Sequence, residues 1–427
     1  MLKSRNVQKS KFELNQQNIL ESLKLESERD AESKETQIYN HQIDAVLAAV
    51  KHFNNAERPN IGLIQIPTGG GKSGIISLLP YALGSHKVLV LSPGKVITKQ
   101  LKSTFGGGDS SKSFLFEKKV ISKDIFVDVL PAVCAIKSPN EIAEMSKYEV
   151  VIVNAQKFSK TANPQIILNG KHEKISADIF ETFDTIIVDE AHHYPAKTWS
   201  DIIDIFNRAD RKIIFLTATP NPAAAKSYRK IFEIPRRDLE ELRIIRKIEF
   251  KPLTLEDINN VNDDELRDLA FKIKEVLSQQ DNVVTNVCHK AMILVKKDKI
   301  YTKEMAQRLT NMSTLDLKAT YCISDVQSKR NYELFDKNDS RTRIMVVCQK
   351  LTEGYDNHNV SVCAVLRNIG SDILFSQFIG RCIRVSHDRN NPQLNDVTAK
   401  VYGPKGMYDR FDKIAVADPE DDDGDDE

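Results

Sequence analysis

Short apolar runs alternate with amphipathic segments along most of the chain. In the first half, runs of Val, Ile and Leu stand near residues 61–66, 87–92, 125–130, 149–153, 183–188 and 212–217, with helical spacing between them. Strands that are apolar without alternation are buried on both faces, as in a parallel sheet covered by helices. The pattern therefore predicts a doubly wound α/β domain over residues 37–235.

A second series of the same kind follows in the other half. Residues 236–264 connect the two series and contain one strand-like run at 244–250, after which we expect a helix near 264–279. Further apolar runs stand near residues 291–295, 317–321, 343–348, 361–366 and 397–401. The fold class is therefore expected to be α/β, with a second parallel-sheet domain over residues 236–417.

The two ends of the chain differ in composition from the rest. Residues 1–36 are rich in Lys, Glu, Ser, Gln and Asn, which predicts a solvated, partly helical arm. Residues 418–427 carry acidic residues and no basic one, which predicts a disordered tail that is either simply solvated or mimics DNA. The formal net charge of the whole chain is +1, so the remainder is basic. A basic body fits an anionic polymer as partner, although surplus lysine also serves solubility.

The spacing of the cysteines and the hydropathy of the chain indicate in which cellular compartment the protein is expected. The 6 cysteines form no C-x-x-C pair and no metal-ligand spacing, which favours a reducing compartment without disulfides or zinc. The first 20 residues lack a hydrophobic signal segment, and no apolar run approaches the ~18 residues of a membrane span. We expect a soluble intracellular protein of the cytoplasm or nucleus without membrane association.

A glycine-rich stretch, Pro67–Ser73, stands between the first strand and a helical run. Glycines let successive backbone N–H groups face one anion, and a helix N-terminus adds partial positive charge. Lys72 can then reach the β- and γ-phosphates of a nucleotide, while the Ser73 hydroxyl ligates Mg²⁺. The general phosphate-loop pattern has glycine where Ile66 stands, so the alternative is a glycine-rich turn with a chance Lys-Ser.

An acidic pair, Asp189 and Glu190, follows the apolar run at 183–188. In a nucleotide site the first carboxylate holds the Mg²⁺ shell, and the second orients or deprotonates the attacking water. The alternative is an ordinary helix N-cap. A phosphate loop on the same predicted sheet favours the nucleotide site, with ATP and Mg²⁺ as its ligands.

These motifs resemble those of superfamily 2 helicases and translocases, in the DEAH-box pattern. Residues 189–192 read Asp-Glu-Ala-His, and Leu-Thr-Ala-Thr-Pro follows at 216–220. Pro67–Ser73 matches the family's loop, Pro-Thr-Gly-x-Gly-Lys-Ser, which needs no glycine at position 66. Residues 352–356 resemble its fifth motif, 377–384 its sixth (Gln-x-x-Gly-Arg-x-x-Arg), 39–42 its adenine-reading Gln element, 92–95 its motif Ia and 290–295 its motif IV.

The resemblance implies two RecA-like domains, with ATP in the cleft between them and nucleic acid across both. Catalytic roles are implied for Lys72, Asp189, Glu190, Gln377, Arg381 and Arg384. Nucleotide binding is implied for Gln42, Thr68, Gly69, Gly70, Gly71, Lys72, Ser73, Gly354 and Asp356, with Ser73 and Asp189 as Mg²⁺ ligands. Coupling to strand movement is implied for His192, Thr217 and Thr219, and backbone contacts with nucleic acid for Pro93, Gly94, Lys95, Asn154 and Gln156.

Two of these assignments have structural alternatives. Arg381 and Arg384 are three residues apart, which predicts one helical face from which they serve as arginine fingers or γ-phosphate sensors. The alternative is a structural pair on a surface helix. Thr217 and Thr219 can also cap the turn before Pro220, in addition to any coupling role.

The identity of the polymer rests on the same resemblance. The Leu-Thr-Ala-Thr-Pro element and the spacing of the sixth motif resemble DNA-repair translocases and restriction-enzyme motor subunits more than the RNA-directed Asp-Glu-Ala-Asp branch. We therefore favour a DNA helicase or translocase. An RNA-dependent ATPase and a motor subunit of a larger complex, with a nuclease for example as partner, remain the alternatives.

Overall fold

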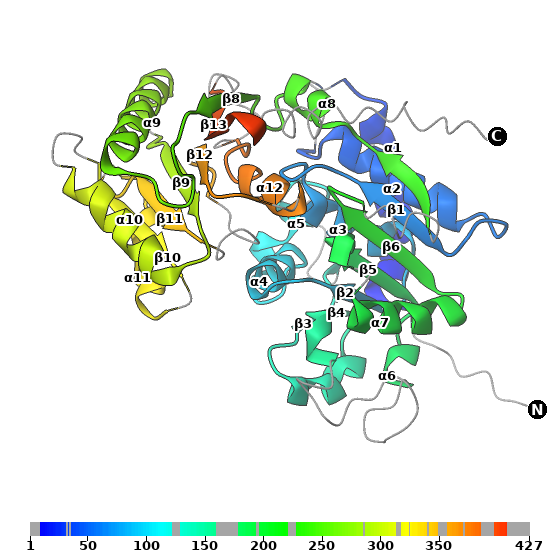
Figure 1. Cartoon of the computed structure of the whole chain (residues 1–427). Helices are drawn as coiled ribbons and strands as arrows, with labels where there is room; N and C mark the ends of the chain where they lie inside the picture. The colour runs from blue at the N-terminus through cyan, green and yellow to red at the C-terminus, as the bar shows by residue number, and fades with distance from the viewer. Residues whose placement is uncertain are drawn as a thin grey trace, which may run out of the picture. The chain divides into compact units, whose positions relative to one another are not determined.

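The computed structural model of the chain divides into two compact units (Figure 1). One comprises residues 1–67 with 71–234, and the other residues 68–70 with 235–427. The expected domain boundary, after residue 235, lies one residue from this division. The structure describes residues 9–30, 33, 36–121, 129–158, 178–193, 196–220, 228–284, 287–312, 317–323, 325–339, 341–348, 357–369, 372–385 and 397–407.

The first unit is built on a parallel sheet of seven strands in the order β3-β4-β2-β5-β6-β1-β7. The strands are β1 Ile61–Gln65, β2 Val88–Leu91, β3 Val133–Ala135, β4 Val150–Val153, β5 Thr185–Asp189, β6 Lys212–Thr217 and β7 Arg229–Glu233. The helices are α1 Lys11–Ser27, α2 Asn40–Phe53, α3 Lys72–Ala82, α4 Lys95–Thr104, α5 Phe114–Glu117, α6 Asp178–Glu181 and α7 Lys197–Arg208. Short 3₁₀ helices lie at Ser110–Lys112, Pro139–Lys147, Ala155–Phe158 and Ala191–His193.

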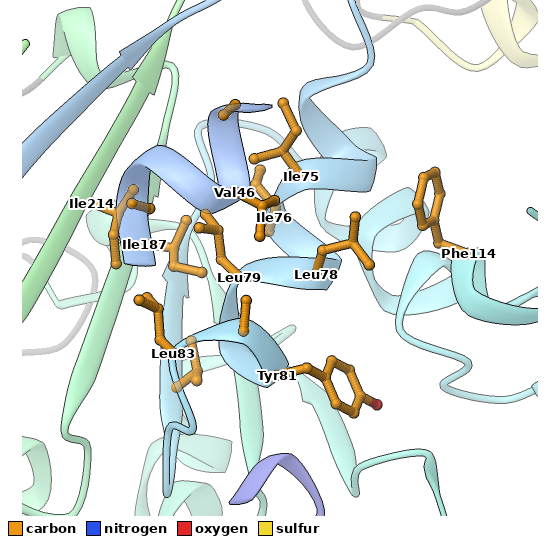
Figure 2. Close-up of a cluster of buried hydrophobic side chains, with 14 of the residues drawn as sticks. Val46, Ile75, Ile76, Leu78, Leu79, Tyr81, Leu83, Phe114, Ile187 and Ile214 are labelled. Carbon is orange, nitrogen blue, oxygen red and sulfur yellow. The ribbon is translucent and has the colours of Figure 1, made fainter. Parts of the chain in front are cut away.

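Each face of this sheet has its own apolar core. Successive strand residues point to opposite faces, so Ile187 packs with α2 and α3 in one cluster, whereas Val188 packs with α7 in the other. Figure 2 shows residues of the first cluster, with Ile187 and Ile214 of the sheet to one side of the side chains of α3. The prediction of a doubly wound sheet, buried on both faces, is confirmed.

The second unit contains a parallel sheet of six strands in the order β10-β11-β9-β12-β13-β8. Its strands are β8 Ile248–Leu253, β9 Lys290–Val295, β10 Ala319–Cys322, β11 Ile344–Val347, β12 Val360–Leu366 and β13 Ala399–Pro404. Its helices are α8 Arg236–Glu241, α9 Asp263–Val283, α10 Lys299–Asn311, α11 Gln327–Asp336 and α12 Asp372–Ile379, with a 3₁₀ turn at Lys405–Met407. The α/β class of both domains is thus as expected. No helix in the described ranges is long and apolar enough to cross a membrane.

Three strands differ from the sequence prediction. Most of the run expected at 125–130 lies outside the described residues, and the neighbouring strand is β3. Strand β7 was not predicted because it begins with two exposed basic residues and pairs only with β1. The strand expected at 244–250 begins later, at Ile248. This strand, β8, does not stand alone in a connector, because it pairs with β13 and forms an edge of the second sheet.

The N-terminal helix α1 corrects the prediction of a solvated arm. Ser10 and Glu13 form a capping box that starts the helix, with 3.1 Å from Glu13 N to Ser10 Oγ. Phe12, Ile19 and Leu23 are fully buried in the core that also contains α3, and the Phe12 ring meets that of Tyr81 edge-on at 4.7 Å. Few apolar residues suffice, because the three lie on one helical face. Residues 1–8 and 418–427 lie outside the described residues.

Replacing Phe12 tests this packing. Phe12→Ala removes a fully buried ring and should lower the free energy of unfolding by about 3 kcal/mol in urea titrations. Leu14→Ala, on the same helix but with its side chain 58% exposed, is the matched control and should change it by less than about 0.5 kcal/mol. Equal, small effects of the two substitutions would show that α1 does not pack as described.

Candidate functional site

The glycine-rich loop joins β1 to α3 at the carboxyl edge of the first sheet. Ile66 N donates to Thr217 O at 3.0 Å, which ties the start of the loop to β6. Gly69 and Gly71 have φ of +86° and +83°, in the left-handed region where glycine is favoured. Gly71 is the N-cap of α3, so Lys72 and the next residue begin the helix. Because the first N–H groups of a helix have no partner within it, this geometry suits an anion.

Gln42 of α2 holds the end of this loop. Its side-chain Nε2 donates to Gly71 O at 2.9 Å, and its Oε1 accepts from Tyr39 N at 3.1 Å. The side chain is buried, and a Cβ at Gly71 would come within 2.3 Å of Gln42 Nε2. The structure thus brings the predicted Gln element against the predicted phosphate loop.

The register of the sheet brings the acidic pair to the same edge. β5, β6 and β1 are neighbours, with Asp189 opposite Leu216 and Gln65 opposite Thr217. Parallel strands end at the same edge, so whatever follows them lies close together. The predicted phosphate loop, acidic pair and Thr217 element are therefore adjacent.

An ion pair joins the loop lysine to the acidic pair. Lys72 Nζ lies 3.5 Å from Glu190 Oε1 and 3.5 Å from the carbonyl oxygen of Ile66. Glu190 has φ of +52°, an uncommon conformation for a residue other than glycine, and its N–H donates to Asp189 Oδ1 at 3.0 Å. The backbone thus turns sharply after β5 and directs the Glu190 carboxylate to the lysine.

Burial changes the titration of Asp189. The pKa of this carboxyl is raised to about 7, chiefly by burial and next by the neighbouring charge of Glu190, while Lys72 opposes the shift. A metal ion at this position requires the ionised carboxylate, so binding it would release a proton.

His192 continues the chain of polar contacts away from the loop. Its Nδ1 lies 3.5 Å from Glu190 Oε2 and 3.3 Å from Thr217 Oγ1. Thr217 Oγ1 accepts from Thr219 N at 3.2 Å, so the predicted turn cap is present. Lys72 is thereby connected through the Glu190 carboxylate, the His192 ring and the Thr217 hydroxyl to the segment expected to couple hydrolysis to movement.

The residues expected to contact nucleic acid lie together at the start of α4. Gly94 is the N-cap of this helix, Lys95 is its first residue, and Asn154 Nδ2 donates to Pro93 O. Gln156 N donates to Asn154 Oδ1 at 2.9 Å. A Cβ at Gly94 would meet no atom within 4 Å, so the backbone there is open to a ligand.

The sixth motif is arranged differently from the prediction. Gln377 lies on α12, but this helix ends at Ile379, so Arg381 and Arg384 do not share a helical face. They follow in a turn, and Arg384 pairs with Ile245 in an isolated antiparallel bridge. The prediction from helical spacing was wrong because the helix ends directly before Gly380. Gly354 and Asp356 lie outside the described residues.

Sequence reasoning did not single out Arg246. Its side chain is buried, and its guanidinium donates to the carbonyl oxygens of Val360 (2.7 Å), His358 (2.9 Å) and Cys382 (3.2 Å). Burial lowers the pKa of this group to about 10. The only signal in the sequence is one basic residue directly after two isoleucines, which does not distinguish it from the next residue, Lys247.

Known proteins match the chain over this architecture. Residues 35–222 match the family model described as "Type III restriction enzyme, res subunit". Over 389 residues the chain is 23% identical to IRC3 of Saccharomyces cerevisiae, whose name describes an ATP-dependent helicase. This match covers 83% of the chain and 50% of the yeast protein, so the chain spans half the length of that relative.

Two solved structures show the same fold at low identity. A fragment of an HsdR subunit of a type I restriction enzyme from Vibrio vulnificus YJ016 is 16% identical, with a TM-score of 0.56, covering 89% of this chain and 66% of that one. The helicase Lhr of Mycobacterium smegmatis, bound to single-stranded DNA and AMP-PNP, is 16% identical, with a TM-score of 0.56, covering 85% and 46%. With its two parallel-sheet domains, the chain has the tandem RecA-like fold of these structures, and over residues 35–222 it is similar to the res-subunit family.

Replacing Gly71 tests the loop geometry. Gly71→Ala adds a Cβ at φ +83° that would meet Gln42 Nε2, so ATP affinity should fall about tenfold or more in calorimetric titrations. Gly406→Ala, where a Cβ meets nothing within 4 Å, is the matched control and should leave the affinity unchanged. An unchanged affinity in Gly71→Ala would contradict the assignment of this loop.

The raised pKa of Asp189 predicts a pH dependence of stability without nucleotide and Mg²⁺. Between about pH 4 and 7 the folded state holds a proton on Asp189 that the unfolded chain has lost, because the ordinary value is 3.8. The contribution of this group to the free energy of unfolding therefore falls as pH rises through that window. Urea titrations at several pH values should show a smaller decline in Asp189→Asn than in the wild type. Identical pH dependence would refute the shift.

Proposed function

We propose that the chain hydrolyses ATP and uses the energy to move along a nucleic acid, with DNA favoured over RNA. The observation that carries the proposal is the convergence of the glycine loop, Lys72, the acidic pair and His192 at one edge of the first sheet. The similarity to the res-subunit family and to the yeast protein named as an ATP-dependent helicase supports the same activity.

The residues at this edge fit ATP with Mg²⁺. The left-handed glycines and the start of α3 suit phosphate oxygens. The buried carboxyl of Asp189 and the hydroxyl of Ser73 are oxygen ligands of the kind that Mg²⁺ prefers. When bound, the ion supplies positive charge that offsets the charge on the phosphates. Asp189 and Ser73 would hold it, while Thr68 and Gly70 complete the loop around the phosphates.

Lys72 and Glu190 would exchange partners when ATP binds. Lys72 Nζ pairs with Glu190 Oε1 at 3.5 Å in the structure. A phosphate group attracts the lysine more strongly than one carboxylate does, because it carries more negative charge at short range. Glu190 is then free to orient a water molecule and to accept its proton. His192 passes the resulting change at Glu190 to Thr217.

The second unit would supply charge to the transition state. We assign to Arg381 and Arg384 the stabilisation of the γ-phosphate and to Gln377 a contact with nucleotide or water, as the family resemblance implies. Gly354 and Asp356 would couple the state of the nucleotide to this unit. Because residues of both units would then act on the nucleotide, hydrolysis would depend on both units.

Nucleic acid would bind through its backbone. The open backbone at Gly94 and the start of α4 suit phosphate groups, and the contacts of Pro93 with Asn154 keep that backbone in place. Contacts of this kind are independent of sequence and weaken with salt. The match to a restriction-enzyme subunit also supports a protein partner such as a nuclease.

ATP hydrolysis with different polymers tests the proposal. The rate should rise on addition of single-stranded or duplex DNA more than on addition of RNA. Lys72→Ala and Glu190→Gln should each reduce the stimulated rate by roughly 10²-fold or more, because each removes a group that acts on the reacting phosphate or water. Stronger stimulation by RNA would favour an RNA-dependent ATPase. Hydrolysis that survives both substitutions would overturn the proposed site.

A further inference from the structure

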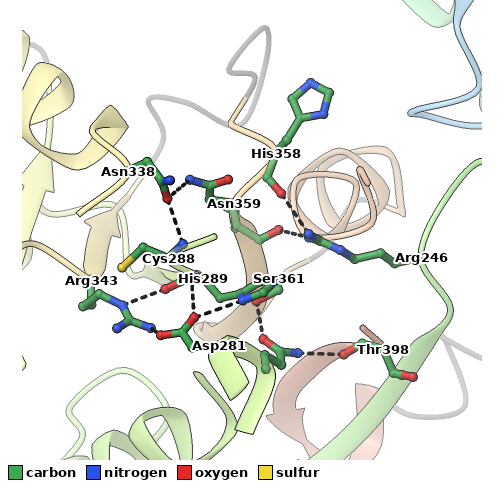
Figure 3. A network of polar contacts seen from close by, with 12 residues as sticks. Arg246, Asp281, Cys288, His289, Asn338, Arg343, His358, Asn359, Ser361 and Thr398 are labelled. Carbon is green, nitrogen blue, oxygen red and sulfur yellow. Dashed lines mark hydrogen bonds and ion pairs between the residues drawn. The ribbon is translucent and has the colours of Figure 1, made fainter. Parts of the chain in front are cut away.

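Arg246 lies where two segments of the second unit meet. His358 and Val360 stand at the start of β12, whereas Cys382 follows α12 within the sixth motif. The guanidinium donates to the carbonyl oxygens of all three, at 2.9, 2.7 and 3.2 Å. Figure 3 shows Arg246 pointing to the backbone beside His358. One side chain thus links β12 to the chain between the two motif arginines.

The backbone around Arg246 strengthens the same link. Arg246 N donates to Ile383 O at 2.7 Å, and Ile245 pairs with Arg384 in the antiparallel bridge. On the far side, His358 Nδ1 contacts Val385 O. Arg246 thus holds Cys382 and Ile383, while Ile245 holds Arg384 and His358 holds Val385.

The chemistry of this position favours arginine over any other residue. Its planar guanidinium directs five N–H donors in a fixed fork, so that one group reaches three carbonyl oxygens. Lysine is a single point of charge on a flexible stem and cannot match that geometry. Burying a cation without a carboxylate partner is costly, and carbonyl oxygens converging on it offset the cost. The guanidinium thereby holds these three carbonyl groups in place.

We propose that Arg246 is a positioning residue that sets the placement of Arg381 and Arg384 for ATP hydrolysis. The inference rests on the proposed function, in which these two arginines act on the γ-phosphate. The buried carbonyl of Cys382 stands one residue after Arg381 and two before Arg384, so a shift of that peptide moves both. Displacement of a reacting group by about 1 Å costs on the order of 10²-fold in rate.

Arg343 provides a matched control in the same unit. It is also largely buried, with its side chain 11% exposed, and it also donates to a backbone carbonyl, that of His289, at 2.7 Å. Its second partner is the Asp281 carboxylate at 2.8 Å (Figure 3). These contacts join α9 to the start of β9 and involve no residue expected in the site. Arg343→Lys therefore reports the general cost of weakening a buried arginine.

The kinetic test compares Arg246→Lys with Arg343→Lys in the full chain. Arg246→Lys should lower kcat for ATP about ten- to a hundredfold with little change in KM, because the ground-state nucleotide is held by the phosphate loop and Lys72. Arg343→Lys should leave kcat unchanged, even where both variants lose similar thermal stability. Arg246→Lys added to the double variant Arg381→Ala/Arg384→Ala should cause no further loss of rate, since Arg246 acts through these two arginines.

A second measurement does not depend on hydrolysis. Cys382 is fully buried, so a thiol reagent followed by mass spectrometry should label it faster in Arg246→Lys than in the wild type or in Arg343→Lys. Cys134, which is partly exposed and lies in the first unit, reports the access of reagent, and its rate should be the same in all three proteins. If Arg246→Lys does not fold, hydrogen exchange in the wild type takes the place of the labelling comparison. The backbone amide of Arg246 should then be strongly protected from exchange, because it donates to Ile383 O.

The outcomes separate this inference from the proposed function. A fall in kcat and faster Cys382 labelling in Arg246→Lys alone support the positioning role. Equal losses of kcat in both lysine variants, or unchanged labelling of Cys382, would overturn it, as would rapid exchange of the Arg246 amide. If the wild type hydrolyses no ATP, the proposed function fails, and the labelling result alone decides whether Arg246 fixes the segment.

Discussion

The parallel register of β1, β5 and β6 is the constraint on which the candidate site depends. These strands run side by side in one direction, so the loop after β1, the acidic pair after β5 and the threonine element after β6 meet at one edge. Both faces of the sheet are apolar and covered, and a slip by one residue would exchange the faces of a whole strand. The core thereby fixes the 3.5 Å approach of Lys72 to Glu190.

Local patterns predicted most of the fold and the first half of the site. Continuous apolar runs predicted β1, β2, β4, β5 and β6 because strands buried on both faces need no polar alternation. The phosphate loop was predictable from its glycines, since positive φ at Gly69 and Gly71 is a local requirement. The acidic pair was predictable from its place after a buried strand.

Features set by distant residues could not be predicted in this way. α1 is sparse in apolar residues, and only the surface of α3 shows why Phe12 and Ile19 suffice to hold it. The carbonyl partners of Arg246 lie 112 to 136 residues further along the chain, so no local spacing indicates them. The helical spacing of Arg381 and Arg384 was misleading for the opposite reason, because it extended a local pattern beyond the end of α12.

We propose that the edge of the first sheet binds ATP together with Mg²⁺ through Asp189. The most direct measurement is calorimetric titration of ATP into the wild type and Asp189→Asn, each with Mg²⁺ and with a chelator. We expect Mg²⁺ to tighten ATP binding in the wild type and this gain to be lost in Asp189→Asn, while metal-free binding persists. No binding by the wild type, or an equal gain from Mg²⁺ in both proteins, would contradict it.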